Sequence, residues 1–277
     1  MQLVTLRQSD GQTSAGRLEG GQVVPLPFED VGALVRSGED WQQRALQGGQ
    51  PVPLTGAAFA PVVPYPSKVI CVGLNYLLHI KEGGGEVPTH PTLFAKFTDA
   101  LTGPYDDIIL PAASERVDWE AELVIVIGRR VRNATGDDAA GAIAGFTIGN
   151  DVSMRDWQRR TTEWLQGKTW EASSPVGPAL VTVDEVGSPR PDLAVSCLVD
   201  GETMQDARTS DLLFDPVELV AYASTVVTLR PGDLIFTGTP EGVGAGRTPP
   251  RFLRPGEVVT TRIEALGQME NRFVSPS

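Results

Sequence analysis

The sequence predicts a β-rich α+β fold, and three observations support this prediction. Seven short stretches are rich in β-branched residues, as strands usually are. Asp200-Gly201 lies between alternating apolar and polar runs, which is a strong hairpin signal. The 30 glycines and 22 prolines favour many short strands and turns over a helical bundle. The seven predicted strands are residues 68–73, 121–128, 144–150, 178–183, 193–199, 232–238 and 257–264.

The first 60 residues are predicted to form a small N-terminal unit. Residues 2–7 and 16–26 have the composition of short strands, and residues 31–47 show patchy helical periodicity. Residues 48–66 then carry five prolines and three glycines, which is typical of a linker or of a segment that docks on the body. We therefore expect a boundary near residue 60, with a main unit at 61–277.

Two helices are predicted in the main unit. One covers residues 215–227, with Asp215 as N-cap and Pro216 at the first helical position. The other lies around residues 153–164, where Ser153 and Asp156 have the spacing of a capping box. A short helix is also predicted at residues 79–82. The remaining predicted elements are strands, so the unit is expected to be β-rich.

Charge and composition exclude several classes of function. The 35 acidic and 23 basic residues give a formal charge of −12, which argues against nucleic acid or an acidic membrane surface as partner. No apolar run approaches the roughly 20 residues that span a bilayer, and the N-terminus has no signal-peptide pattern. Cys71 and Cys197 lie in apolar stretches and are expected to be buried thiols. These features favour a cytoplasmic location.

The first candidate site is the acidic segment Asp118-Trp119-Glu120-Ala121-Glu122, which precedes an apolar run. Residues two apart in a strand point to the same face, so Glu120 and Glu122 are expected to lie side by side. Two adjacent carboxylates at the start of a buried strand repel each other unless a cation lies between them. The alternative is a solvated strand end with acidic side chains.

A third carboxylate, Asp151, follows another predicted strand. Arg155 and Gln158 are three residues apart, so on a helix they share a face. A carboxylate beside a guanidinium and an amide suits a metal together with an anionic substrate. The alternative is an ordinary helix start with a surface arginine.

His79 and Glu82 form the third candidate, on a predicted short helix. Their spacing allows a carboxylate–imidazole contact that would orient the ring and raise its basicity. The glycine-rich residues 83–91 would then be a lid that closes on substrate. The alternative is a surface pair without catalytic function.

Lys168, in the segment Gly167-Lys168-Thr169-Trp170, is expected to be a buried or half-buried cation facing keto-acid oxygens. The segment is not a phosphate-binding loop, because Thr162 stands where that motif requires glycine. The glycines at 242–246 precede a proline-rich stretch that cannot begin a helix, which excludes a dinucleotide-binding fingerprint. No motif for thiolate, zinc-protease or serine-hydrolase chemistry is present.

Taken together, the motifs resemble the fumarylacetoacetate hydrolase superfamily. The resemblance rests on seven blocks in a fixed order over roughly residues 65–275. The blocks are KVICVGLNYLLHIKE, PTLFAKF, GPYDDIILP, DWEAELVIVIG, GNDVSMRDWQ, GKTWEASSPVGP and GDLIFTGTPEGVG. One position departs from many relatives, because Trp170-Glu171 stand where the motif often has Phe followed by Asp or Thr.

The resemblance implies a fold, a cofactor and roles for individual residues. The fold would be a mixed β-roll or barrel, usually assembled as a homodimer. Three carboxylates would bind one Mg²⁺ or Mn²⁺, and they are Glu120, Glu122 and Asp151. The dyad that activates water would be His79 and Glu82. The positions that hold substrate oxygens would be Arg155, Gln158, Lys168 and Thr239.

We therefore expect a metal-dependent hydrolase that cleaves a carbon–carbon bond in a small keto acid. The predicted substrate is an acylpyruvate of the fumarylpyruvate type, from aromatic compound catabolism. His79 would deprotonate a water, and Lys168 would stabilise the oxyanion. The main alternative is an isomerase or decarboxylase of a dicarboxylic acid, such as a hydroxyheptadienedioate isomerase or an oxaloacetate decarboxylase. A further alternative is a homologue without catalytic function.

Overall fold

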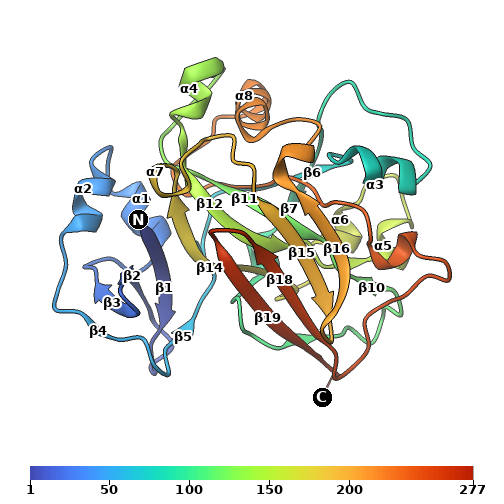
Figure 1. Ribbon diagram of the computed structural model, residues 1–277, viewed down its shortest axis with the longest axis horizontal. Coiled ribbons are helices and arrows are strands. Elements are labelled where there is room, and N and C mark those ends of the chain that lie inside the picture. The colour runs from blue at the N-terminus through green and yellow to red at the C-terminus, as the bar shows by residue number, and fades with distance from the viewer. Residues whose placement is uncertain (277) are drawn as a thin grey trace.

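The computed structural model describes residues 1–276 as two packed sheets with helices around them (Figure 1). The larger sheet has twelve strands, ten of them in a continuous order. That order is β4 (Val52–Pro53), β3 (Gln22–Pro25), β2 (Thr13–Glu19), β1 (Gln2–Arg7), β14 (Ser174–Thr182), β12 (Ile143–Asn150), β11 (Ala121–Ile127), β17 (Leu234–Phe236), β6 (Val69–Gly73) and β7 (Thr92–Lys96). The remaining two are β5 (Ala58–Phe59) beside β1 and β8 (Leu101–Thr102) beside β14. The β-rich α+β prediction is confirmed.

A second sheet of five strands packs against the centre of the first. Its order is β16 (Glu202–Arg208), β15 (Ala194–Val199), β18 (Val258–Ile263), β19 (Gly267–Val274) and β9 (Ile108–Ile109). The predicted hairpin joins β15 to β16, and Asp200 and Gly201 have φ of +49° and +82°. Positive φ at both central residues is what a type I′ turn requires. The two-stranded ribbon β10 (Val117–Asp118) and β13 (Ser153–Met154) completes the β structure.

The central strand β11 is apolar apart from Glu122, because both of its faces are buried. Leu123, Ile125 and Ile127 pack toward the five-stranded sheet, in the larger hydrophobic core. Val124 and Val126 pack on the opposite face, in a core shared with the N-terminal segment. The rigid middle of the molecule therefore lies at β11 and its neighbour β12.

The helices are short, with one exception. The long one is α8 (Pro216–Val226), whose Asp215 cap and first-turn proline are as predicted. The others are α1 (Val31–Arg36), α2 (Trp41–Leu46), α3 (Leu77–Glu82), α4 (Gly136–Ala140), α5 (Arg155–Gln158), α6 (Leu165–Lys168) and α7 (Val183–Val186). Three 3₁₀ turns are η1 (Thr98–Ala100), η2 (Thr209–Asp211) and η3 (Gly244–Gly246). Within the described residues, no helix is long and apolar enough to cross a bilayer.

The N-terminal segment joins the large sheet directly. β1 pairs with β14, and α1 and α2 lie beside β1–β3 at one end of the molecule (blue in Figure 1). Residues 16–26 are two strands separated by Gly20-Gly21, not one, and residues 31–47 are two helices separated near Gly38. The division near residue 60 stays a prediction.

The helix predicted around residues 153–164 is wrong over most of its length. Only Arg155–Gln158 are helical, and Ser153 belongs to strand β13. The capping box is wrong too. The Ser153 hydroxyl donates to the Asp151 carbonyl, and the Asp156 carboxylate accepts a hydrogen bond from Ser114. Ser153 pairs with Asp118 in the ribbon with β10, so the first two residues of the predicted helix belong to a strand.

Candidate active site

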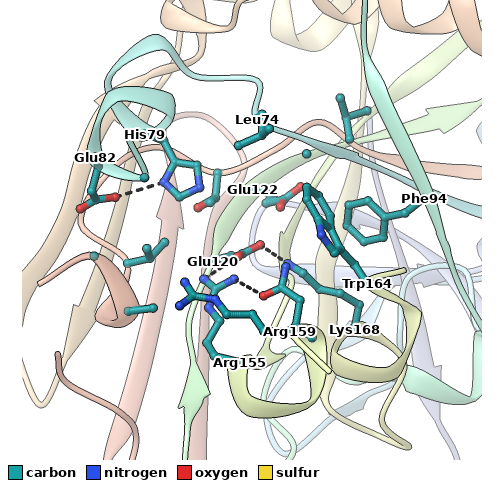
Figure 2. Close-up of a pocket in the computed structure, with 18 of the residues that line it drawn as sticks. Leu74, His79, Glu82, Phe94, Glu120, Glu122, Arg155, Arg159, Trp164 and Lys168 are labelled. Atoms are coloured by element: carbon teal, nitrogen blue, oxygen red, sulfur yellow. Dashed lines mark hydrogen bonds and ion pairs between the residues drawn. The ribbon is translucent and has the colours of Figure 1, made fainter. Parts of the chain in front are cut away.

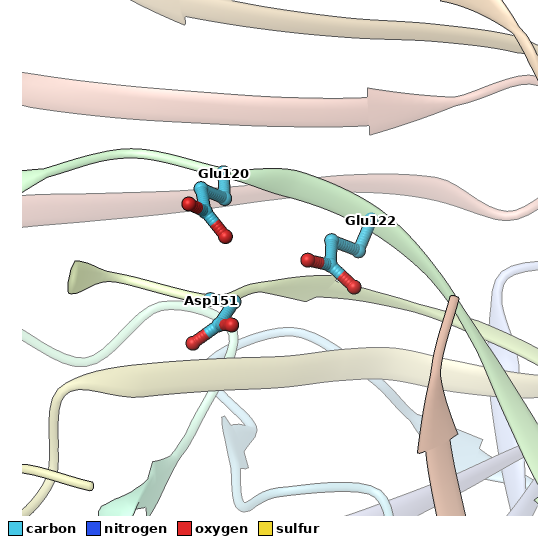
Figure 3. Close-up of side chains that lie close together, drawn as sticks. All are labelled: Glu120, Glu122 and Asp151. Carbon is cyan, nitrogen blue, oxygen red and sulfur yellow. The ribbon is translucent and has the colours of Figure 1, made fainter. Parts of the chain in front are cut away.

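Three carboxylates lie together at one end of β11 and β12 (Figure 3). The two strands are antiparallel, with Ala121 opposite Asn150, so Glu120 and Asp151 flank the same register pair. The Asp151 amide donates to the Glu120 carbonyl at 2.9 Å, and Glu122 follows two residues along the strand. Oxygens of Glu120, Glu122 and Asp151 lie within 4.8 Å of one another. The predicted acidic cluster is therefore formed.

Buried cations surround two of these carboxylates. The Lys168 ammonium lies 2.6 Å from a Glu120 oxygen and 2.9 Å from an Asp151 oxygen. Lys96 lies 2.8 Å from the other Asp151 oxygen and also donates to the Lys168 carbonyl. Burial alone would raise the pKa of Glu120, but the charges on Lys168 and Arg155 outweigh it and lower the pKa to about 2. Glu120 is therefore an anion in the folded protein.

Glu122 is different, because no cationic side chain within residues 1–276 pairs with it. The residue is 2 % exposed, and its carboxylate accepts a 2.7 Å hydrogen bond from the Gly238 amide. Burial and the negative charges on Asp151 and Glu120 raise the pKa of Glu122 well above its ordinary range. A divalent cation among the three carboxylates would remove this repulsion. Oxygen donors without sulfur or imidazole suit a hard cation such as Mg²⁺ or Mn²⁺.

Arg155 connects the carboxylate cluster to neighbouring segments through all three guanidinium nitrogens. Its Nε donates to Asp118 at 2.8 Å, its Nη1 donates to Gln158 at 3.0 Å, and its Nη2 lies 2.6 Å from Glu120. Burial lowers the pKa of Arg155, but Glu120 and Asp118 outweigh it and raise the pKa above its ordinary value. Asp118 also accepts hydrogen bonds from the backbone amides of Gly244 and Ala245. Arg155 therefore links the carboxylates to the 244–245 turn.

The predicted dyad lies at the rim, on α3. His79 Nδ1 is 3.1 Å from Glu82, whose other oxygen accepts a 3.0 Å hydrogen bond from the Gly242 amide. Partial burial raises the pKa of Glu82, but the contacts with His79 and Gly242 outweigh it and leave the pKa below its ordinary value. Before α3, the Asn75 amide donates to the carbonyl of Thr237 at 2.7 Å. This bond fixes the start of the helix to the end of β17.

One cavity of about 510 Å³ is lined by Glu120, Glu122, Arg155, Lys168, His79 and Glu82. Figure 2 shows Glu120 and Glu122 in its interior, His79 and Glu82 on one side, and Arg155, Arg159 and Lys168 on another. Phe94 and Trp164 form an aromatic wall, with ring centroids 5.4 Å apart. The cavity therefore combines a carboxylate cluster, several cations and an imidazole.

Every site residue predicted from the sequence is at or beside this cavity. Asp151 contributes to the buried cluster, and Thr239 and Gln158 line the wall. The Thr239 hydroxyl donates to the Ala121 carbonyl at 3.0 Å and accepts from Gln205, so it is held by the protein itself. The arrangement can bind an anionic ligand through a metal and move a proton at the rim.

Residues 68–274 match the family model described as fumarylacetoacetate (FAA) hydrolase C-terminal. This match covers most of the chain. The chain belongs to the fumarylacetoacetate hydrolase family. Members of this enzyme family share the sheet arrangement described above, so the predicted fold type is confirmed.

Individual relatives carry different activities in their names. The chain is 48% identical over 235 residues to the mitochondrial oxaloacetate tautomerase FAHD2A of Bos taurus, covering 84% of this chain and 74% of the relative. It is 35% identical to the structure of a 5-carboxymethyl-2-hydroxymuconate delta-isomerase from Mycobacterium smegmatis, with a TM-score of 0.80 and full coverage of both chains. It is 28% identical to a maleylpyruvate hydrolase from Sphingobium sp. SYK-6, solved with manganese(II) and pyruvate, with a TM-score of 0.82 and full coverage of both.

For this member of the fumarylacetoacetate hydrolase family, the sequence analysis gave no role to three residues of the site. Lys96 lies in the PTLFAKF block, but a single lysine in an apolar run carries no spacing signal. Asp118 is two residues before Glu120, and that spacing was a usable signal. Trp164 packs against Gly73, where a Cβ would lie 2.2 Å from the indole, and only the fold brings the two together.

Proposed function

We propose that this chain is a divalent-metal-dependent enzyme that interconverts the keto and enol forms of a small 2-oxo dicarboxylic acid such as oxaloacetate. The observation that carries this proposal is the buried carboxylate cluster opening into a cavity lined by cations and an imidazole. The similarity to an oxaloacetate tautomerase and to a delta-isomerase supports it. The proposal therefore follows the isomerase alternative and places the acylpyruvate hydrolase second.

The metal ligands in this proposal are Glu120, Glu122 and Asp151. When bound, Mg²⁺ or Mn²⁺ acts as a Lewis acid that polarises the 2-oxo carbonyl and offsets negative charge on its oxygen. Lys168 holds the Glu120 and Asp151 carboxylates in place through its ammonium group. It also adds positive charge to the cavity, which favours binding of an anionic substrate.

The proton is moved by His79. Its Nδ1 is engaged by Glu82, and the ring lines the cavity, so Nε2 is the nitrogen left to exchange a proton with substrate. His79 Nε2 accepts the proton from carbon 3, next to the 2-oxo group, and the electron pair of that bond forms the enolate. The same proton then passes from Nε2 to the enolate oxygen, which gives the enol. Neither water nor a second reactant is consumed, and the reverse direction uses the same groups.

Acylpyruvate hydrolysis is a second candidate, favoured by the same dyad. An imidazole that is oriented by a carboxylate can equally deprotonate water. The maleylpyruvate hydrolase with a similar fold also supports this reaction class. In this case a water would attack the distal carbonyl, and the carbon–carbon bond would break to give pyruvate and a carboxylic acid.

The test is to follow the decay of enol absorbance in oxaloacetate solutions with purified protein plus Mg²⁺, Mn²⁺ or EDTA, against the uncatalysed rate. Metal-dependent acceleration without pyruvate release is the expected result. Release of pyruvate from oxaloacetate would instead indicate decarboxylation, and pyruvate plus an acid from acylpyruvates would indicate hydrolysis. The Glu122→Gln variant is the matched control, because it retains the size of the side chain and removes one proposed ligand charge.

A further inference from the structure

Four cationic side chains line the cavity, and they differ in their partners. Lys168 contacts two carboxylates, and all three nitrogens of the Arg155 guanidinium have acidic or amide partners. Arg247 donates from Nη2 to the Met204 carbonyl at 3.1 Å. Arg159 has neither an ion pair nor a side-chain hydrogen bond with any other residue in the range 1–276. It is therefore the cation most available to a ligand.

The Arg159 side chain points into the cavity because of its position at the end of α5 relative to Arg155. Arg159 is the C-cap residue of α5, and its amide donates to the Arg155 carbonyl at 3.3 Å. Residues four apart on a helical turn lie on the same face. Figure 2 shows Arg159 on the α5 side of the cavity with Arg155, across from His79. Arg155 is buried and paired with the carboxylate cluster, whereas Arg159 is exposed at the rim.

We infer that Arg159 binds the second carboxylate of a dicarboxylic substrate, and so selects 2-oxo dicarboxylates over 2-oxo monocarboxylates. The inference rests on the proposed function, in which the 2-oxo end of the substrate is directed to Glu120, Glu122 and Asp151. The other end of the molecule then lies toward the rim. A guanidinium there offers two parallel N–H donors to a carboxylate, which is a strong and directional pairing.

The adjacent Arg160 provides a matched control. Its guanidinium carbon lies 3.4 Å from the centroid of the Trp157 ring, and Arg160 is not among the residues that line the cavity. Arg159→Met and Arg160→Met therefore change the net charge of the protein equally, one residue apart. Only the first removes a guanidinium from the cavity.

The experiment measures calorimetric Kd values for 2-oxoglutarate and 2-oxopentanoate in the presence of Mg²⁺. The two ligands have the same five-carbon chain and differ only in the terminal group, a carboxylate or a methyl. Wild type is expected to prefer 2-oxoglutarate. Arg159→Met should weaken 2-oxoglutarate binding about tenfold and change 2-oxopentanoate binding by less than about twofold. Arg160→Met should change neither, and Arg159→Lys should lie between wild type and Arg159→Met.

Three results from the variants would overturn the inference. They are equal weakening of both ligands by Arg159→Met, an equal effect of Arg160→Met, and a loss of selectivity in Arg247→Met but not in Arg159→Met. Equal wild-type affinity for the two ligands would overturn it as well. The inference and the proposed function fail separately. If oxaloacetate tautomerisation is not accelerated but Arg159→Met still abolishes the dicarboxylate preference, the reaction is wrong and the carboxylate subsite stands.

Discussion

The two halves of the cavity are built in opposite ways. The carboxylate cluster extends from the ends of β11 and β12, and the side chains of Glu120 and Asp151 are 6% and 0% exposed. The dyad lies on α3, a helix of six residues, and its side chains are 17% and 19% exposed. Strands hydrogen-bonded on both sides fix the cluster, whereas the dyad is held by a few contacts to loops.

This difference corresponds to different chemical requirements. Metal ligands must hold a defined geometry, and groups on a buried sheet do so with little freedom. A group that moves a proton must meet substrate that enters from solvent, so it belongs near the opening. We therefore expect changes in the cluster to have large effects on folding or metal binding, and changes in the dyad to act mainly on turnover, with only a small effect on stability.

The largest effect is expected for Asp151→Ala. Asp151 is fully buried and contacts both Lys96 and Lys168, so its loss leaves two buried cations without this partner. Breaking buried ion pairs in this way costs about 3–5 kcal/mol of stability. Urea unfolding of the variant should show this loss, and Asp137→Ala, at an exposed position, should show almost none. A loss below about 1 kcal/mol would mean that the cluster does not stabilise the fold.

Glu122→Gln should separate metal binding from folding. Glu122 has no cationic partner within residues 1–276, and a glutamine oxygen can still accept the bond from Gly238. We therefore expect unchanged or slightly increased thermal stability without metal. Catalysis should fall about a thousandfold, because one anionic ligand is lost. Thermal unfolding measures the stability, enol decay measures the catalysis, and Mn²⁺ titration measures the metal affinity, which should fall. A Mn²⁺ affinity equal to that of wild type would show that Glu122 is not a metal ligand.

His79→Ala should separate turnover from metal binding and folding. Loss of a general base commonly lowers kcat by about 10²–10⁴-fold. Because His79 does not contact the carboxylate cluster, metal affinity and unfolding free energy should stay close to wild type. Steady-state kinetics and Mn²⁺ titration check the two parts. Unchanged turnover would exclude the dyad from the mechanism.

The sequence predicted the carboxylate cluster well because strand alternation is a local rule. Glu120 and Glu122 share a face by their spacing alone, and Asp151 was singled out by its place after another predicted strand. The His79–Glu82 contact followed from helical spacing in the same way. Local periodicity therefore identified both halves of the site.

Contacts between segments far apart in the sequence could not be predicted from local periodicity. Lys168 was singled out, but its bonds to Glu120 and Asp151 join residues that are 48 and 17 positions apart. Lys96 was missed because its contact with Asp151 depends on how β7 lies relative to β12. The start of the helix predicted around 153–164 was wrong for the same reason, because the pairing of Ser153 and Met154 with β10 is a tertiary effect.

Gly246→Ala should disturb the dyad without touching it chemically. A Cβ at Gly246 would lie 2.4 Å from the Glu82 carboxyl carbon, so Glu82 and the His79 ring that it orients would have to move. A small misplacement of a catalytic group lowers turnover, here by about tenfold. Gly85→Ala is the control, because its Cβ would make only ordinary contacts at 3.7 Å. Equal kcat in both variants would mean that the position of Glu82 is not critical.

The smallest effect is expected for Glu82→Gln, which should lower the unfolding free energy by an amount that depends on pH. The contacts from His79 and Gly242 outweigh burial and lower the pKa of Glu82 in the folded state below its ordinary value of about 4.3. The resulting stabilisation is therefore present above that ordinary value and is lost as the pH falls through the folded-state pKa.

The difference in unfolding free energy between wild type and Glu82→Gln should accordingly be about 1 kcal/mol at pH 7 and should shrink at pH 3. Urea unfolding at the two pH values measures it, with Glu86→Gln at an exposed neighbouring position as the control. If the difference in unfolding free energy is the same at both pH values, the charge on Glu82 does not stabilise α3 at the edge of the cavity. In that case packing against Gly246 would be the interaction that fixes α3, and Gly246→Ala should then reduce stability as well as turnover.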